Sequence, residues 1–296
     1  MRHIPVLLNE VLDGLNLRSG MNAVDCTLGD GGHSEKILEE ISPKGKLIGI
    51  DADPEAVLEA KQYLYRFAEN FIAIRDNFVN LKKIIQDNNF EKTGAVLLDL
   101  GWSSSQFARR GRGFSFQNLV EPLDMRYAFK SEIKDDKTAS YILNNYNQSE
   151  LERVFRKYGE EKNSHTIAEA IVVKRKKKRI ELAGELVDII LSVKPRTEKI
   201  HPATRIFQAL RIEVNNELEV LKSVLPRALE ILAPGGRLAV ITFHSLEDRI
   251  VKQFFQKQSG LKQIQLINKK PIIASSDELK NNPKARSAKL RIVEKN

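Results

Sequence analysis

The chain has 296 residues, of which 42% are hydrophobic, and it carries a net charge of +9 at neutral pH. These values predict one large or two modest globular domains and exclude a disordered chain. No stretch approaches the ~20 apolar residues of a membrane span, and Asn9 and Glu10 interrupt the N-terminal apolar run too early for a signal peptide. We therefore expect a cytoplasmic protein without a membrane partner, and the basic charge favours nucleic acid as its partner.

The first hundred residues alternate short apolar runs, which are typical of strands, with helical patterns. The expected strands, each bounded by Gly, Asp or Asn, are Asn22–Cys26, Lys46–Asp51, Phe71–Arg75 and Gly94–Leu100. The expected helices are Leu8–Leu15, Ser34–Ile41, Pro54–Phe67 and Val79–Gln86. Strands that alternate with helices predict a mostly parallel sheet joined by right-handed crossovers.

The middle of the chain changes to an all-helical pattern, with no strand signal from about Thr138 to Val193. We interpret residues 108–200 as a helical insertion into the α/β domain. The insertion holds 20 Lys and Arg against 14 Asp and Glu, so it carries two-thirds of the excess positive charge of the chain. This charge predicts a module that binds a polyanionic partner such as nucleic acid.

The α/β pattern returns after residue 200, so residues 1–107 and 201–296 form the predicted α/β domain. The elements expected there are one long helix over Pro202–Leu232, a strand over Arg237–Phe243, a helix with Ser245 as its N-cap and Asp248 three residues later, and weaker strands over Leu261–Ile267 and Lys289–Glu294. On the long helix one face is polar, which indicates either an ordinary surface or a substrate contact: Arg205, Gln208, Arg211 and Asn215.

Acids and glycines follow consecutive strands of the predicted sheet. Asp25, Asp51 and Asp99 end the first, second and fourth strands, and Gly29-Asp30-Gly31-Gly32 forms the turn after the first. Open α/β sheets bind ligands at the carboxyl ends of their strands. Glycines let the backbone approach a ligand closely, and the helix that follows points free N–H groups toward it. We therefore predict a nucleotide-like cofactor, with Asp51 accepting hydrogen bonds from ribose hydroxyls.

Two cofactors fit this loop, a dinucleotide and S-adenosylmethionine. The dinucleotide fingerprint G-x-G-x-x-G requires glycine at its sixth position, where this chain has Ser34. Asp25 and Asp30 would repel a pyrophosphate and attract the sulfonium and ammonium groups of S-adenosylmethionine. The residues thus favour methyl transfer, and they leave a dinucleotide-dependent oxidoreductase and a non-catalytic Rossmann-like domain as alternatives.

Motifs along nearly the whole chain resemble the RsmH (MraW) family, the bacterial small-subunit ribosomal RNA cytosine-N4 methyltransferases. The matching segments are His3–Leu8, Asp25–Ser34, Gly49–Pro54, Leu97–Gly101, Arg112–Phe116, Pro122–Arg126, His201–Arg205, Phe207–Arg211, Phe243–Arg249 and Asn282–Arg291. The resemblance implies a class I S-adenosylmethionine-dependent methyltransferase, with a Rossmann-like, mostly parallel sheet and an inserted all-helical domain. It further implies N4-methylation of a cytidine in the decoding region of 16S ribosomal RNA, within the small ribosomal subunit.

The family pattern also assigns residues to the site. The cofactor contacts that it implies are Gly31, Gly32, His33, Asp51, Phe78, Asp99 and Gln106. Candidates to face the substrate amine are Asp99, Ser103, Ser104 and His244. Of these, Asp99 fits the cofactor better, and His244 could equally fix the turn at Ser245. The loop over residues 101–106 departs from the family, since relatives usually carry Val and Pro at positions 102 and 105.

Further features leave alternatives open. The six cations of Lys174–Arg179 indicate either contact with RNA phosphates or a solvated helix end. The five histidines show no metal-ligand spacing with each other or with Cys26, so we predict no catalytic metal and a core role for Cys26. A homodimer and a ribosome assembly factor without catalysis remain hypotheses.

Overall fold

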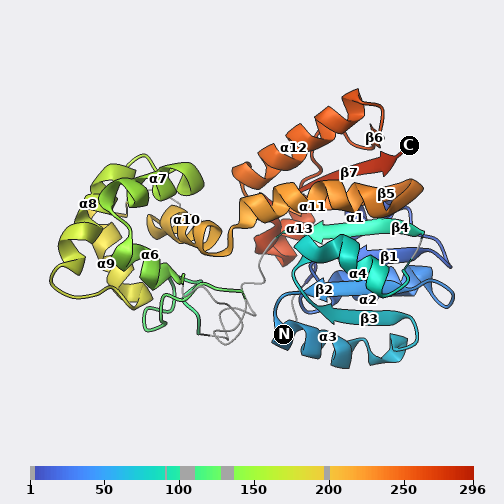
Figure 1. The fold of residues 1–296 in the computed structure, drawn as a ribbon, viewed down its shortest axis with the longest axis horizontal. Helices are drawn as coiled ribbons and strands as arrows, with labels where there is room; N and C mark the ends of the chain where they lie inside the picture. Colours follow the sequence, from blue (N-terminus) through green and yellow to red (C-terminus); the bar gives the residue numbers. More distant parts are fainter. Residues whose placement is uncertain (1–3, 91, 101–110, 128–136, 197–200) are drawn as a thin grey trace. The chain divides into compact units, whose positions relative to one another are not determined.

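The structure is a computed structural model that describes residues 4–90, 92–100, 111–127, 137–196 and 201–296. The chain divides into two units, the first formed by Met1–Gly101 with Leu218–Asn296 and the second by Trp102–Glu217 (Figure 1). The predicted boundary at residues 200 and 201 therefore differs from the observed one, because residues 201–217 group with the helical unit.

The first unit is built on a seven-stranded sheet of order β3-β2-β1-β4-β5-β7-β6. Strand β7 runs in the direction opposite to that of the other six strands. Its strands are β1 (Asn22–Asp25), β2 (Leu47–Asp51), β3 (Phe71–Arg75), β4 (Thr93–Asp99), β5 (Leu232–Thr242), β6 (Ile264–Leu266) and β7 (Lys289–Lys295). Its α-helices are α1 (Leu8–Leu15), α2 (Gly32–Ile41), α3 (Pro54–Tyr63), α4 (Leu81–Asp87), α11 (Glu217–Ile231, whose first residue belongs to the second unit), α12 (Ser245–Gly260) and α13 (Ser276–Asn281). The chain order reverses between β1 and β4, which is the place where such sheets bind ligands.

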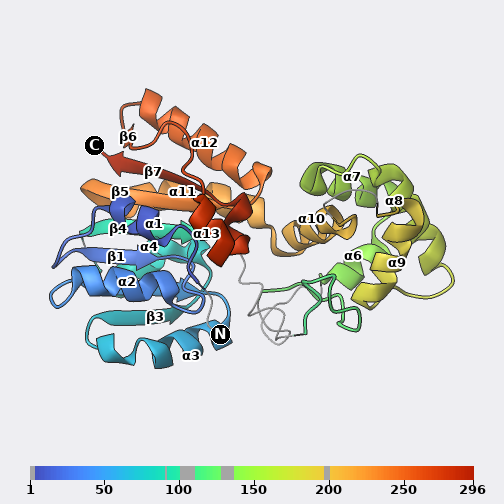
Figure 2. The ribbon, with the colours of Figure 1, turned by 180° about the vertical axis from the view of Figure 1, so that it is seen from behind.

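Helices cover both faces of this sheet (Figures 1 and 2). Helices α4, α11 and α12 pack on one face against side chains such as Val96 and Val240, whereas α1, α2 and α3 pack on the other against Leu97 and Ile241. Alternate residues of each strand point to opposite faces, so both faces need apolar side chains. Cys26 lies in the first of these cores, where burial raises the pKa of its thiol well above the usual range. The predicted core role of Cys26 is confirmed.

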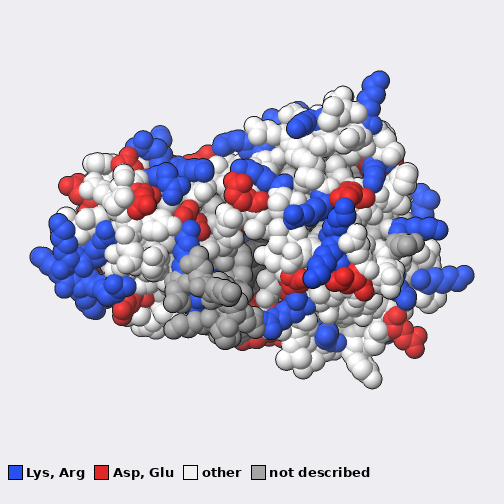
Figure 3. Space-filling view, in the orientation of Figure 1, with Lys and Arg blue, Asp and Glu red and all other residues white. Residues whose placement is uncertain are grey.

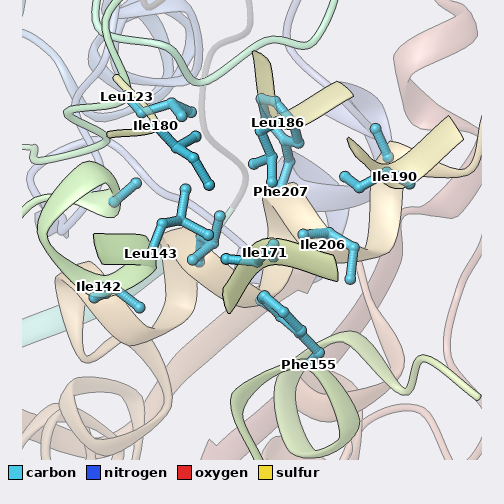
Figure 4. Close-up of a cluster of buried hydrophobic side chains, with 14 of the residues drawn as sticks. Leu123, Ile142, Leu143, Phe155, Ile171, Ile180, Leu186, Ile190, Ile206 and Phe207 are labelled. Atoms are coloured by element: carbon cyan, nitrogen blue, oxygen red, sulfur yellow. The ribbon is translucent and has the colours of Figure 1, made fainter. Parts of the chain in front are cut away.

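The second unit is helical in its described part. It contains α6 (Ala139–Asn145), α7 (Gln148–Gly159), α8 (Ser164–Arg175), α9 (Ala183–Val193) and α10 (Ala203–Asn215). Their apolar faces meet in one core, in which Leu143, Phe155, Ile171 and Ile206 are fully buried (Figure 4). Among all described residues, no helix combines the length and apolarity that a membrane span needs.

The single helix predicted over Pro202–Leu232 is wrong, because two helices occupy this range. Asn216 adopts a left-handed conformation, with φ of 52°, and ends α10. Asparagine reaches this conformation more easily than most residues, which makes it a common helix terminator. The apolar stripe looked continuous because α10 and α11 each carry one, and these stripes belong to different cores.

The polar face predicted on this helix serves the helical unit itself. Each of its four side chains donates to a group of the same unit: Arg205 to Glu160 O at 3.1 Å, Gln208 to Tyr158 O at 2.9 Å, Arg211 to the Glu217 carboxylate at 2.8 and 3.0 Å, and Asn215 to Met125 O at 2.7 Å. These bonds satisfy backbone carbonyls at the end of α7 and at Met125, and they pair the Arg211 charge, which is only 8% exposed. They explain the polar residues without a substrate.

Candidate functional site

The turn between β1 and α2 requires its glycines for two physical reasons. Gly29 and Gly31 have φ of 50° and 75°, a left-handed conformation that strains other residues. A Cβ atom on Gly32 would lie 2.7 Å from the Pro5 side chain, so the N-terminal segment packs directly on the loop. Gly31 then caps α2, and the first N–H groups of this helix are available at the loop. Such a bare backbone surface fits a nucleotide-like cofactor.

Asp51 ends β2 beside this loop, and the loop backbone holds its carboxylate. Gly29 N donates to Oδ2 and Asp53 N donates to Oδ1, each at 2.9 Å. A carboxylate oxygen can accept more than one hydrogen bond. The half-buried Asp51 therefore fits the ribose-binding role that its position predicts.

Asp25 is buried within the protein, whereas the charge argument assumed an exposed acid. Its carboxyl group is 1% exposed, and burial raises its pKa above the ordinary value. Ser34 donates to Oδ2 at 2.7 Å, and Thr27 N donates to Oδ1 at 3.0 Å. Asp25 thus supports the loop from beneath. The serine that breaks the dinucleotide fingerprint has a structural reason, because glycine at position 34 could not make this bond.

Thr27 is a site residue that the sequence reasoning missed. Its hydroxyl donates to Asp25 Oδ1 at 3.3 Å and accepts a hydrogen bond from Asp99 N at 2.7 Å. Thr27 therefore ties the end of β1 to the end of β4. A threonine two residues after an acid is a typical local hydrogen-bonding pattern and could have indicated this role.

His33 lies in the first turn of α2 and is buried. Its Nε2 lies 3.0 Å from Val6 O, and its Nδ1 lies 3.6 Å from Asp99 Oδ2. Burial lowers the pKa of His33 to about 4, so the ring is neutral at neutral pH. The proton then belongs on Nε2, where Val6 O accepts it. His33 thereby ties the N-terminal segment to the glycine loop, and the acid at the end of β4 lies near its other ring nitrogen.

The buried His33 predicts a pH dependence of stability. A histidine with a pKa of 6.5 unfolded and about 4 folded binds its proton more readily in the unfolded chain. Its stabilising effect is therefore complete above pH 6.5 and decreases as the pH falls toward 4. Between pH 7 and pH 5 we expect it to cost about 2 kcal/mol of unfolding free energy.

Urea denaturation of the wild type and His33→Gln at pH 7 and pH 5 measures this cost. The glutamine variant retains an amide N–H for Val6 O but does not titrate. Groups such as Asp25 titrate in both proteins, so the difference between the two isolates His33. An equal pH response in both proteins contradicts the assignment.

The N-terminal segment is itself held by the C-terminal part of the chain. Glu278 of α13 accepts a hydrogen bond from Leu7 N at 2.7 Å, and Asn282 donates to Ile4 O at 3.1 Å. Because Val6 contacts His33 and Pro5 contacts Gly32, these distant residues help to position the cofactor loop. No local sequence pattern reveals such contacts.

Phe78 follows β3 and is half-buried against the core under α4. Arg75, at the end of β3, pairs in register with Asp51, so Phe78 follows the strand next to the ribose-binding acid. This placement agrees with a contact to the adenine, which stays a prediction. Three further residues predicted for the site lie outside the described residues: Ser103, Ser104 and Gln106.

His244 caps α12, which corrects the cap predicted at Ser245 with Asp248. The His244 side chain accepts from Glu247 N, while the buried Glu247 carboxylate accepts from His244 N at 3.3 Å and from Phe243 N at 2.9 Å. The other ring nitrogen of His244 lies 3.1 Å from Glu247 Oε1. This reciprocal arrangement is a capping box, and it supports the hypothesis that His244 fixes the turn.

Comparison with known proteins agrees with this geometry. The MraW methylase family matches residues 1–296. The chain belongs to this family. Two relatives named Ribosomal RNA small subunit methyltransferase H are similar to it: the protein of Dictyoglomus thermophilum is 46% identical and that of Carboxydothermus hydrogenoformans 44% identical, each over 99% of this chain and 96% and 97% of the relative.

A fold comparison agrees as well. The crystal structure of PH0851 resembles the whole chain with a TM-score of 0.51 at 14% identity, and the match covers 47% of that protein. The predicted class I methyltransferase fold is confirmed, as are the predictions of an enzyme of this family and of S-adenosylmethionine as its cofactor.

The capping role of His244 in this methylase leads to a second prediction. We expect His244→Ala to lower the unfolding free energy by about 1 kcal/mol, because the cap of α12 is lost. His244→Asn retains a capping side chain, so it should recover both stability and turnover. The measurements are urea denaturation and initial rates of methyl transfer. Normal stability of His244→Asn with lost turnover would instead assign the ring to the chemistry.

Proposed function

We propose that this protein transfers a methyl group from S-adenosylmethionine to N4 of a cytidine in the decoding region of 16S ribosomal RNA. The observation that carries the proposal is the bare glycine turn beside Asp51, whose carboxylate is oriented by two backbone N–H groups. The names of the relatives support ribosomal RNA of the small subunit as the substrate. The sequence motifs of the family support the cytidine N4 atom.

In this proposal each cofactor group has its own contact in the first unit. The glycine turn at Gly31 and Gly32 lies next to the cofactor, Asp51 accepts from its ribose, and Phe78 packs against its adenine. Asp99 carries negative charge toward its cationic end. The neutral His33 adds no opposing charge there. When bound, S-adenosylmethionine provides a methyl group on a positively charged sulfur, so no metal is needed for activation.

The substrate amine determines what the protein must add. The lone pair of N4 is delocalised into the cytosine ring, which makes the amine a weak nucleophile. The protein therefore has to hold N4 in line with the methyl–sulfur bond, a proximity effect that is worth several kcal/mol. A carbon–nitrogen bond forms as the carbon–sulfur bond breaks, and N4 then loses one proton. The target base must leave its stack to be held in this way.

The helical unit provides a basic surface for the RNA. The six cations Lys174–Arg179 lie at the C-terminal end of α8 and in the turn after it, where Figure 3 shows a dense cluster of Lys and Arg. Two of them serve the fold, since Arg175 donates to Leu143 O at 2.7 Å and Lys178 pairs with Glu185 at 2.6 Å. The other four are exposed, and none forms an ion pair with a residue that the structure describes. We propose that they contact RNA phosphates.

Transfer of a labelled methyl group to small ribosomal subunits tests this function. The subunits come from cells that lack the enzyme, and the labelled nucleotide is then mapped and identified. We expect one labelled cytidine, modified at N4, in the decoding region. Binding to subunits without any label would contradict the enzymatic proposal and favour an assembly factor, and label on another base or position would contradict the proposed target. Free 16S RNA, assayed in parallel, shows which form is the substrate.

A further inference from the structure

A cavity of about 310 Å³ opens in the first unit where β5 ends. It lies beyond β5, whereas the glycine turn follows β1, and the contacts described for that turn do not line it. Its walls come from the end of β5 and from the C-terminal segment before β7, and the side chains that matter here are Phe243, His244, Ile273, Leu279, Arg286 and Lys289. The volume is at the lower end of the ~300–1,000 Å³ typical of ligand sites, so it suits a small ligand.

The charge on this cavity is positive. Arg286 is exposed on the 3-10 helix over Pro283–Ser287, and among the described residues no carboxylate pairs with it. Lys289 Nζ lies 3.4 Å from Asp248 Oδ2, but Arg291 already binds that carboxylate with an Nε–Oδ1 distance of 2.7 Å. Asp248 is thus shared between two cations. Arg286 and Lys289 can therefore receive an anion, and an arginine fork favours a phosphate.

Apolar surface lies beside these cations. Phe243 and His244 are half-buried, and Ile273 leaves 65% of its surface exposed in the same cavity wall. Inorganic phosphate gains no binding free energy from this apolar surface. A base or ribose attached to the phosphate would cover the surface and bind more tightly. Rings and a phosphate together are the chemistry of a nucleotide, and sequence-tolerant stacking on an aromatic side chain is common where single strands bind.

The cavity lies at the same edge of the sheet as the proposed site of methyl transfer. Strand β5 is the neighbour of β4, which ends at Asp99, and Leu100 N donates to Ile241 O at 3.0 Å. Phe243 and His244 follow directly after β5. A strand of RNA whose target base reaches the end of β4 would thus bring a neighbouring nucleotide to the end of β5.

We propose that this cavity binds one nucleotide of the RNA strand next to the methylated one. Arg286 and Lys289 hold its phosphate, and Phe243, Ile273 and Leu279 contact its ribose or base. The inference rests on the proposed function and adds a second contact point for the substrate. It explains why two cations and an exposed isoleucine converge on a cavity that the cofactor does not need.

Binding of a five-nucleotide single-stranded RNA, followed by fluorescence anisotropy, tests this site. We expect Arg286→Glu to weaken binding at least ~10-fold and to lower the salt dependence by about one phosphate contact. Ile273→Ser should weaken it about three-fold through lost apolar contact. The matched controls are Lys269→Glu and Leu261→Ser, which change exposed residues outside the cavity and should alter binding less than two-fold.

Competition identifies what the cavity binds. Cytidine monophosphate should compete with the RNA better than ribose 5-phosphate does, and inorganic phosphate least. If inorganic phosphate competes as well as cytidine monophosphate, the proposal that the cavity binds a nucleotide is wrong. If the variants and their controls lose the same RNA affinity, the proposal that this cavity contacts RNA is wrong. Tighter binding of free cytidine monophosphate than of RNA would assign the cavity to a free nucleotide.

The RNA assay does not depend on methyl transfer. A wild-type protein that binds RNA through Arg286 yet transfers no methyl group would therefore contradict only the proposed function. The affinity for S-adenosylmethionine should stay the same in all variants, because none of them changes the glycine turn or Asp51.

Discussion

Asp51→Ala should abolish measurable binding of S-adenosylmethionine in isothermal titration calorimetry. Its carboxylate accepts from Gly29 N and Asp53 N, so it both orients the glycine turn and presents oxygens to the ribose. Each hydrogen bond to a charged group contributes about 1.5–3 kcal/mol. Loss of two ribose contacts therefore lowers the affinity at least ~100-fold, before any disorder of the loop is counted.

Two further variants separate the possible causes. Asp51→Asn keeps one carbonyl oxygen as an acceptor and should bind with intermediate affinity. Asp87→Ala removes an exposed acid at the end of α4, far from the loop in sequence and on another element, and should bind like the wild type. Unchanged affinity of Asp51→Ala, with the fold intact by circular dichroism, would remove Asp51 from the cofactor site.

The second large effect is expected from the basic cluster on the helical unit. Replacing Lys174, Lys176, Lys177 and Arg179 by alanine removes the four cations that have no ion pair among the described residues. Each phosphate contact adds about 0.7–0.9 to the slope of log affinity against log salt. We therefore expect the slope to fall by about three, and the affinity for 16S RNA at low salt to fall by two orders of magnitude or more.

The control must remove the same charge from another surface. Lys61, Lys83, Lys252 and Lys257 are exposed cations of the first unit, and replacing all four by alanine changes the net charge equally. Arg175 and Lys178 stay in both proteins, because their contacts to Leu143 and Glu185 belong to the fold. Equal losses in the two quadruple variants would indicate an effect of net charge alone. An unchanged slope in the cluster variant would mean that the cluster is only a solvated helix end.

Local patterns predicted much of the first unit correctly. The strand over Leu47–Asp51 matched its prediction to within one residue, because a strand buried on both faces is a short apolar run. The position of the acids Asp51 and Asp99 followed from strand ends, since parallel strands share one carboxyl edge. The glycine turn could also be predicted, because left-handed backbone favours glycine.

Predictions failed where a residue is compatible with two local structures. Asn216 fits inside a helix or at its end, and the apolar spacing on either side of it did not indicate that the helix ends there. Ser245 and His244 can both cap a helix, and only the buried Glu247 selected His244. In each case the folded structure selected one of two local states that differ by about 1 kcal/mol.

The sequence by itself determined that acids and glycines meet at one edge of a parallel sheet and that the chain is a methyltransferase of its family. Tertiary structure alone decided how each of these groups is held. Asp25 and Asp51 look alike in the sequence, yet the Ser34 hydroxyl and Thr27 bind the first, whereas two backbone N–H groups orient the second. Burial depends on segments from both ends of the chain, such as residues 4–7 and 278–282, and no local pattern encodes which side chains they will cover.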